Sequence, residues 1–218
     1  MQSFLNKNDS RSIVILGAGG HAKVLAEVLS LSGKNIIGCI TPDKKPGEVC
    51  FGIEVLGPDS ILPKFSNKEV LIANGIGALP NITLRQEITD KVQDLGFEFI
   101  SIIHPKAIIS ENVRLSYGVQ IMAGVIIQSG SLIGANSIIN TGSIIDHDCI
   151  IGENCHISPG VVLCGGVVIE PFVSIGAGSS VLQNISIGAN SIVASGSVVY
   201  KNIDKNVTFI QSKFEINK

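Results

Sequence analysis

A six-residue repeat runs without interruption through the second half of the sequence. Its first position is an Ile, Leu or Val in 17 consecutive hexads, from Ile103 to Val199, with no insertion or deletion. The position four residues later is always small or β-branched, from Ala107 to Ile203. A fixed short period of this kind is the sequence signature of a solenoid.

The repeat predicts a triangular prism of stacked coils. Each hexad forms one flat side, with its first residue in the interior and its small residue near a corner. Three hexads make a coil of 18 residues, and about 5.7 coils at the strand spacing of about 4.8 Å give a prism about 27 Å tall. Trp is absent and aromatic residues are 5% of the chain, so Ile, Val and Leu must fill the interior. A β-sandwich would need irregular turns, which do not keep 17 hexads in phase.

The first hundred residues alternate strands and helices instead. We expect strands at 12–16, 36–40, 70–73 and 97–103, and helices at 22–31 and 82–95. Such alternation predicts a parallel sheet with helices on its faces. The chain is therefore expected to hold an α/β domain over 1–102, a β-helix over 103–204 and a C-terminal tail over 205–218.

Several classes of protein do not fit the chain. The first eleven residues lack the apolar stretch of a signal peptide, and the first apolar run is too short to span a bilayer. A net charge of −2 without a Lys/Arg run argues against nucleic-acid binding. The five cysteines show no metal-binding spacing and are expected as reduced thiols: Cys39, Cys50, Cys149, Cys155 and Cys164. We therefore predict a cytoplasmic protein that binds no metal.

A glycine-rich loop, Gly17-Ala18-Gly19-Gly20-His21, follows the first predicted strand and opens the first helix. Backbone N–H groups at such a helix start can hold a phosphate. As a dinucleotide fingerprint the loop is incomplete, because Thr41-Pro42 stand where an acidic residue is expected and Asp43 comes later. The loop therefore favours a phosphate-bearing ligand other than NAD. Gly75 follows the third strand and either lines the same pocket or is a plain loop glycine.

An Asp-His-Asp segment centred on His147 occupies an outward position of the repeat. An imidazole can take a proton from an attacking amine near neutral pH, and a neighbouring carboxylate can fix its tautomer. The other interpretation is a solvated histidine on a turn. Gly165 comes one coil after His147, so we expect the two side by side. Its backbone N–H can serve as an oxyanion donor, or the glycine can simply form a corner turn.

His156 comes nine residues after His147, which is half a coil. The two histidines are therefore expected on opposite sides of one chain, where they cannot form a dyad within one subunit. A site that uses both must lie between subunits. Cys149 and Cys155 fall on interior positions, so neither is expected to act as a nucleophile.

The hexads match those of the hexapeptide-repeat acyltransferases, whose fold is a left-handed parallel β-helix. The glycine loop domain followed directly by an unbroken β-helix resembles, from about Ser12 to Ile203, the NeuD/PglD family of sugar acetyltransferases. The resemblance implies a small Rossmann-like nucleotide-binding domain followed by a left-handed β-helix. It also implies a homotrimer with active sites between subunits and acetyl-CoA as cosubstrate.

The resemblance also carries roles for particular residues. The segment from Asn140-Thr141 to Asp148 matches the family's catalytic segment, with His147 as general base, Asp148 as its orienting carboxylate and Asp146 as a second candidate. We expect acetyl-CoA to contact His156 and Gly165. The expected sugar-nucleotide contacts are Gly17, Gly19, Gly20, His21, Asp43, Gly75 and Asn140.

The implied reaction is direct acetyl transfer to the amino group of a UDP-, TDP- or GDP-linked 4-amino-4,6-dideoxy sugar in bacterial surface-glycan synthesis. Two departures limit the resemblance. Asp43 alone remains of the family's acidic pair, which leaves the nucleotide open. Residues 206–210 replace the Gly-x-Pro-Ala segment found near CoA in many hexapeptide acyltransferases, so no CoA contacts are carried over there.

Three other functions remain open. A sialic-acid-type sugar O-acetyltransferase could use the same histidine on a hydroxyl group. A γ-class carbonic anhydrase also has this fold but needs three histidine ligands, for which the chain offers His104, His147 and His156. A non-enzymatic trimeric scaffold would leave the Asp-His-Asp segment unexplained.

Overall fold

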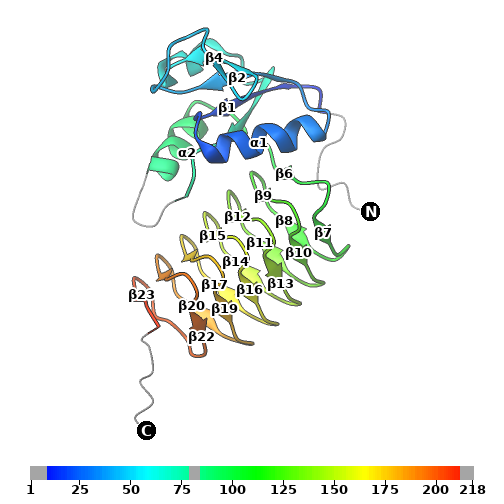
Figure 1. Cartoon of the computed structure of the whole chain (residues 1–218), viewed down its shortest axis with the longest axis vertical. Helices are drawn as coiled ribbons and strands as arrows, with labels where there is room; N and C mark the ends of the chain where they lie inside the picture. The colour runs from blue at the N-terminus through cyan, green and yellow to red at the C-terminus, as the bar shows by residue number, and fades with distance from the viewer. Residues whose placement is uncertain (1–8, 79–83, 212–218) are drawn as a thin grey trace. The chain divides into compact units, whose positions relative to one another are not determined.

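The computed structural model describes residues 9–78 and 84–211, which form two compact units (Figure 1). The first unit extends to Pro105 and includes Tyr117–Gln120. The second contains Lys106–Ser116 and the chain from Ile121 onward. The predicted α/β fold followed by a β-helix is confirmed.

The first unit is built on a five-stranded sheet in the order β3-β4-β2-β1-β5. The strands β4, β2, β1 and β5 are parallel, and β3 is antiparallel to β4. The strands are β1 (Ser12–Leu16), β2 (Ile36–Ile40), β3 (Val49–Cys50), β4 (Ile53–Gly57) and β5 (Val70–Asn74). The helices are α1 (Gly20–Leu31), α2 (Leu84–Asp94) and the 3-10 helix η1 (Asp59–Lys64).

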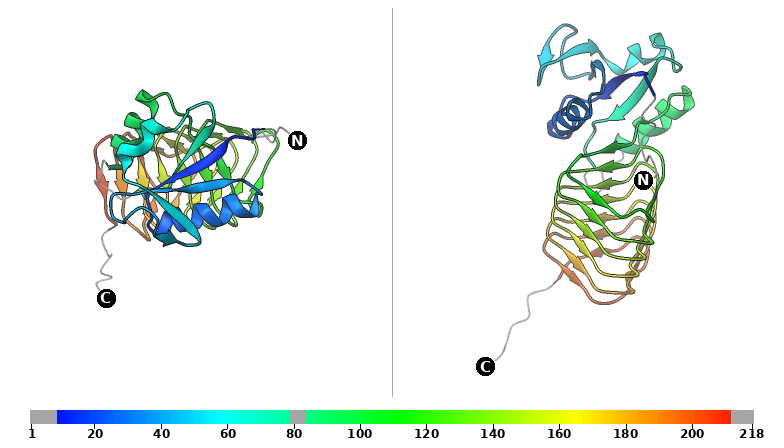
Figure 2. Two further views of the ribbon diagram at one scale, coloured as in Figure 1. Left: turned by 90° about the horizontal axis from the view of Figure 1, so that it is seen from above. Right: turned by 90° about the vertical axis from the view of Figure 1, so that its right-hand side faces the viewer.

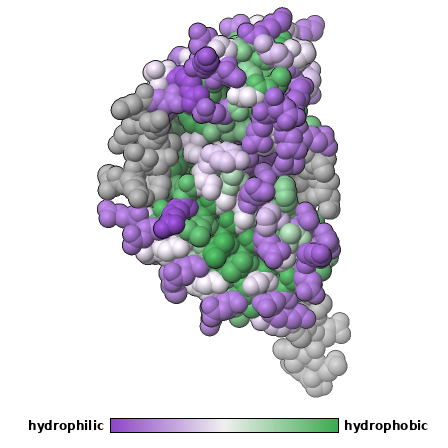
Figure 3. Space-filling model, turned by 180° about the vertical axis from the view of Figure 1, so that it is seen from behind, coloured by the Kyte–Doolittle hydropathy of each residue, from purple (hydrophilic) through white to green (hydrophobic). Residues whose placement is uncertain are grey.

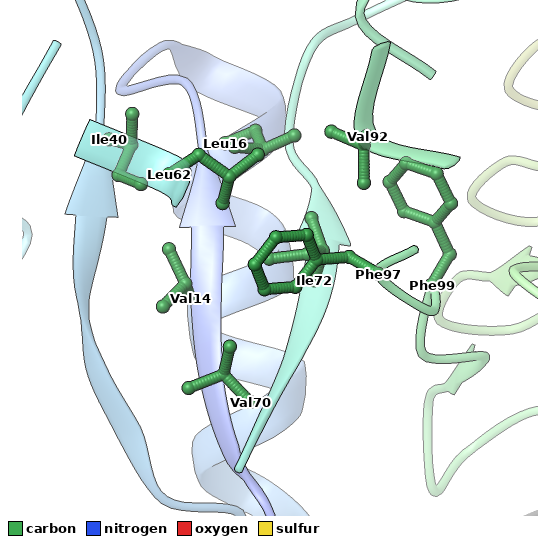
Figure 4. Close-up of a cluster of buried hydrophobic side chains, with 9 residues drawn as sticks. All are labelled: Val14, Leu16, Ile40, Leu62, Val70, Ile72, Val92, Phe97 and Phe99. Atoms are coloured by element: carbon green, nitrogen blue, oxygen red, sulfur yellow. The ribbon is translucent and has the colours of Figure 1, made fainter. Parts of the chain in front are cut away.

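Buried aliphatic and aromatic side chains hold one face of this sheet (Figure 4). They come from β1, β2, β5, η1, α2 and the segment after α2: Val14, Leu16, Ile40, Leu62, Val70, Ile72, Val92, Phe97 and Phe99. The chain passes from β1 to β2 on one side and later returns to β5 on the other. The connections after β1 and β5 therefore lead to opposite sides of the sheet. Open α/β sheets bind their ligands at the carboxyl ends of two such strands.

The sequence predicted most of this unit, but not all of it. The strands at 12–16 and 36–40 are confirmed, whereas β3, β4 and η1 were missed. Helix α2 lies within the predicted span, whose residues 82 and 83 fall outside the described part of the chain. The single strand predicted at 97–103 is wrong. Phe99 forms one isolated bridge to Ile72, and Ile102–Ile103 pair in a different sheet, so this apolar run serves two sheets.

The solenoid is made of two-residue strands in three parallel sheets, whose stacked coils are seen in Figure 2. The first sheet holds β7 (Ile108–Ile109), β10 (Ile126–Ile127), β13 (Ile144–Ile145), β16 (Val162–Leu163), β19 (Ser180–Val181) and β22 (Val198–Val199). The second holds β8 (Arg114–Leu115), β11 (Leu132–Ile133), β14 (Ile150–Ile151), β17 (Val168–Ile169) and β20 (Ser186–Ile187). The third holds β6 (Ile102–Ile103), β9 (Gln120–Ile121), β12 (Ile138–Ile139), β15 (His156–Ile157), β18 (Ser174–Ile175), β21 (Ile192–Val193) and β23 (Thr208–Phe209).

Paired residues confirm the predicted coil length. Ile127 pairs with Ile145, which is 18 residues later. The last coil is shorter, because Val193 pairs with Phe209. Strand pairing thus continues past residue 204 into the stretch expected as tail.

Buried serines at the small position of the hexad bond successive coils together. Ser137 is fully buried, donates its hydroxyl to Gly152 O at 2.8 Å and accepts from Cys155 N–H at 2.9 Å. Ser131 and Ser179 make the same pair of bonds to the next coil. Each serine therefore satisfies a carbonyl and an amide that the corner would otherwise leave buried without a partner.

Replacing Ser137 by alanine is expected to lower the free energy of unfolding by about 1–3 kcal/mol, because both backbone groups lose their partner. Ser137→Cys should cost less, since Cys155 fills an equivalent position and its thiol bonds to Glu170 O at 3.1 Å. Urea unfolding of both variants measures the difference. Equal losses would show that a thiol cannot replace the hydrogen bonds of the hydroxyl at this position.

Candidate active site

His147 lies in the turn after β13, in contact with the carboxylate that follows it. Its Nδ1 is 2.9 Å from Asp148 Oδ2, and its backbone N–H donates to Asp146 Oδ1 at 2.8 Å. The His147 side chain is 63% exposed. Asp148 has a φ of +57°, a left-handed conformation that Asp and Asn tolerate better than most residues. With Nδ1 engaged by a carboxylate, Nε2 is the nitrogen that can take a proton from a ligand.

Two glycines make room for this pair on the neighbouring coils. A Cβ on Gly165 would lie 2.6 Å from both Cε1 and Nε2 of His147. A Cβ on Gly130, one coil earlier, would overlap Asp148 Oδ1. Gly166 N–H is already used, because it donates to His147 O at 2.9 Å. Among the described backbone groups beside the ring, Gly165 N–H is therefore the better candidate for an oxyanion donor.

The hydrogen bond that His147 donates to Asp148, with the charge of Asp146, raises the pKa of His147 above its ordinary value. Both carboxylates favour the imidazolium. A base with this pairing holds the proton it receives more tightly, but it becomes neutral and active only at a higher pH.

His156 is in β15, on a different sheet from β13, in agreement with the half-coil separation. Its Nε2 is 3.3 Å from Asn140 Nδ2. Asn140 Oδ1 accepts from Thr141 N–H at 2.8 Å, which orients the amide so that Nδ2 faces the histidine. Two predicted site residues, Asn140 and His156, are thus in contact. His147 lies on another face of the same solenoid.

The glycine loop of the first unit has the form expected for an anion site. Gly17 has a φ of +85°, and Gly19 precedes α1 in an extended conformation without a side-chain cap. Helix α1 begins at Gly20, and a Cβ on Gly19 or Gly20 would meet no described atom within 4 Å. The open backbone and the positive end of the α1 dipole suit a phosphate group.

Gly75 and Asp43 follow the strands that flank β1. A Cβ on Gly75 would lie 2.5 Å from Leu16 O and 2.7 Å from Ala22 Cβ, so Gly75 lets β5 approach the glycine loop. Asp43 is exposed after β2, and its backbone N–H donates to Thr41 Oγ1 at 3.3 Å. Gly75 therefore has a packing role that the sequence did not indicate. The exposed Asp43 carboxylate accepts from the Thr41 hydroxyl at 3.4 Å.

A polar network beside this loop was missed by the sequence analysis. Arg85 NH1 donates to Asn74 O at 3.0 Å and to Ile76 O. Gln120 Nε2 donates to the same Asn74 carbonyl at 2.8 Å, and its Oε1 is 2.7 Å from His21 Nε2. The one available signal was Asn74, a polar residue that ends an otherwise apolar strand.

Both the α/β part and the solenoid of this chain match known protein families. Residues 12–92 match the PglD N-terminal domain, and residues 130–165 and 166–201 match the bacterial transferase hexapeptide (six repeats). A solved structure of perosamine N-acetyltransferase from Caulobacter crescentus, in complex with CoA and GDP-perosamine, is 37% identical, with a TM-score of 0.82, over 90% of this chain and 93% of that one. The chain belongs to the NeuD/PglD family of hexapeptide acyltransferases.

Two other solved structures are similar to this chain over most of its length. The acetyltransferase domain of PglB from Neisseria gonorrhoeae, in complex with acetyl coenzyme A, is 31% identical with a TM-score of 0.81, over 89% of this chain and 93% of that one. WeeI from Acinetobacter baumannii is 22% identical over 90% of this chain and 94% of that one, with a TM-score of 0.80, and shares the fold. No curated protein matches the sequence. The chain is therefore an acyltransferase, as the sequence predicted.

In this protein, the thiols of Cys149 and Cys155 are poor nucleophiles. Burial raises the pKa of Cys149 to about 11 and that of Cys155 to about 12. Among residues 9–78 and 84–211, no group of three His, Cys, Asp or Glu side chains is placed to hold a metal ion. No helix in the same part of the chain is long and apolar enough to cross a membrane.

Asp148→Asn is expected to move the acid limb of the kcat/KM profile to lower pH. The variant loses the main cause of the raised pKa, so His147 becomes neutral at lower pH. As a weaker base it should also lower the plateau by roughly tenfold. Asn fits the left-handed backbone at this position, so the fold should be unaffected. Asp146→Asn is the matched variant, with a smaller shift in the same direction. An unmoved limb in both would contradict His147 as the titrating group.

Proposed function

We propose that the chain is an acetyl-CoA-dependent N-acetyltransferase acting on a nucleotide-linked 4-amino-4,6-dideoxy sugar. The observation that carries the proposal is the exposed His147, with Nδ1 on Asp148 and Gly165 beside the opposite edge of its ring. The CoA and GDP-perosamine complex of the Caulobacter relative supports the cosubstrate and the substrate class.

The proposed chemistry is one direct transfer. The sugar amine attacks the thioester carbonyl carbon, and His147 Nε2 takes a proton from the nitrogen as the tetrahedral intermediate forms. Gly165 N–H donates to the oxyanion. The carbon–sulfur bond then breaks, and the imidazolium returns the proton to the leaving CoA sulfur. No acyl-enzyme is formed, which agrees with the buried, weakly acidic thiols of Cys149 and Cys155.

In this proposal the first unit binds the nucleotide part of the substrate. Its glycine loop lies at the carboxyl end of β1, where the strand order reverses direction across the sheet. The diphosphate would sit at the start of α1, with Asp43 available to the ribose or base. GDP is the first nucleotide to test, because the Caulobacter relative binds GDP-perosamine.

We further propose that the active enzyme is a homotrimer with its sites between subunits. The outward positions of β7, β13 and β22 expose Ile108, Ile144 and Val198. The half-buried residues between them are Ile126, Val162 and Ser180. Hydrophobic residues gather on the solenoid in Figure 3 as well. Such a ladder is suited to burial against a second copy. Because His147 follows β13 and His156 is in β15, on a different sheet, a site that needs both requires two subunits.

A panel of acceptors tests the proposal. The protein is incubated with acetyl-CoA and with GDP-, UDP- or TDP-linked 4-amino-4,6-dideoxy sugars, and free thiol is followed. Thiol release with one nucleotide sugar, and an amide in the product, is the expected result. Release with sialic acid alone would favour the O-acetyltransferase, and no release with any sugar would favour the scaffold.

A further inference from the structure

Gln120 lies fully inside the first unit, between His21 and the end of β5. It is 1% exposed. Its Nε2 donates to Asn74 O at 2.8 Å, and its Oε1 is 2.7 Å from His21 Nε2. Both contacts belong to the unit that ends at Pro105 and includes Tyr117–Gln120.

The Asn74 carbonyl fixes the direction of these bonds. A carbonyl oxygen only accepts, so the Gln120 atom facing it must be the NH₂ group. The Gln120 atom facing His21 is then the amide oxygen, which also only accepts. His21 Nε2 must therefore carry a hydrogen.

A second hydrogen, on Nδ1, would make the His21 ring positively charged. Burial lowers the pKa of His21, and the positive charge of Arg85 acts in the same direction, against the opposing effect of the Gln120 bond. His21 is therefore neutral near pH 7, with its hydrogen on Nε2 and a lone pair on Nδ1. No hydrogen bond of Nδ1 is found among the described residues.

We propose that Gln120 is a positioning residue that holds His21 as the Nε2–H tautomer, so that Nδ1 accepts a hydrogen bond from a hydroxyl or amino group of the substrate. A phosphate oxygen cannot supply that hydrogen. His21 thus selects a sugar or ribose group, while the backbone of the glycine loop takes the diphosphate. The hydrogen bond between Nδ1 and the substrate rests on the proposed function, whereas the tautomer of His21 does not.

The tautomer is tested on the full-length protein without substrate. Long-range NMR of protein with ¹⁵N-labelled histidine, assigned by the loss of signals in His21→Asn, should show His21 protonated on Nε2 and not on Nδ1 near neutral pH. Gln120→Leu should give a mixture of tautomers, while Asn74 O keeps its bond from Arg85. A hydrogen on Nδ1 in the unaltered protein would overturn the proposal.

The role of Nδ1 is tested with two matched variants. His21→Asn keeps a polar atom near the place of Nδ1, and His21→Gln keeps one near the place of Nε2. We expect KM for the nucleotide sugar to rise about tenfold in His21→Gln, the size expected for one hydrogen bond, and by less than about threefold in His21→Asn. The effect should fall on KM for the nucleotide sugar and not on KM for acetyl-CoA. Equal increases, or the larger one in His21→Asn, would overturn the acceptor role. If no nucleotide sugar is acetylated at all, the proposed function fails while the NMR result stands.

Discussion

His147→Ala is expected to lower kcat by about 10²–10⁴ and to leave both KM values nearly unchanged. General base catalysis by a positioned imidazole contributes about that factor. An interaction made mainly in the transition state affects kcat more than binding. His147 is exposed on a turn, so its loss removes no part of the hydrophobic core. Thiol release at saturating acetyl-CoA and sugar nucleotide measures the change.

Gln183→Ala is the matched control for His147→Ala. Gln183 is exposed and stands two coils later at the equivalent position of the repeat. It should retain nearly full kcat, and both variants should unfold at the same urea concentration as the unaltered protein. A kcat for His147→Ala within about threefold of the unaltered enzyme would exclude His147 as the base.

The solenoid was predictable because its constraints are local and repeated. Each first-position residue must fill the same interior space, and each small residue must fit the same corner. Counting by 18 therefore placed Gly165 beside His147 and put His156 on another face. The same arithmetic missed the shortened last coil, since Phe209 pairs with Val193 after 16 residues.

The first unit was less predictable because its decisive contacts join distant residues. Gln120 bonds to Asn74 and to His21, which are 46 and 99 residues away in sequence. No periodicity relates these positions, and Gln120 stands just before the aliphatic position of its hexad, where the repeat also allows residues such as Arg114 and Ser174. The hairpin of β3 and β4 was also missed, because the two residues of β3 carry too little alternation to be recognised as a strand.

Gly165→Ala is expected to lower kcat by about 10² without weakening the fold. The new Cβ would lie 2.6 Å from Nε2 and Cε1 of His147. The glycine is outside the left-handed region, so alanine suits its backbone, and the exposed ring can move aside. That movement pulls the imidazole from Asp148 and from the attacking amine. A displacement of about 1 Å can cost about 10² in rate.

A double-mutant cycle with His147→Ala decides whether Gly165 acts through the ring. If it does, Gly165→Ala should have almost no further effect in the His147→Ala background, because there is no imidazole left to displace. The urea unfolding midpoint should stay unchanged in all three variants. A full additional loss of about 10² in the double variant would mean that the methyl group blocks acetyl-CoA itself. In that case KM for acetyl-CoA should rise with Gly165→Ala alone, whereas a displaced base leaves that KM unaltered.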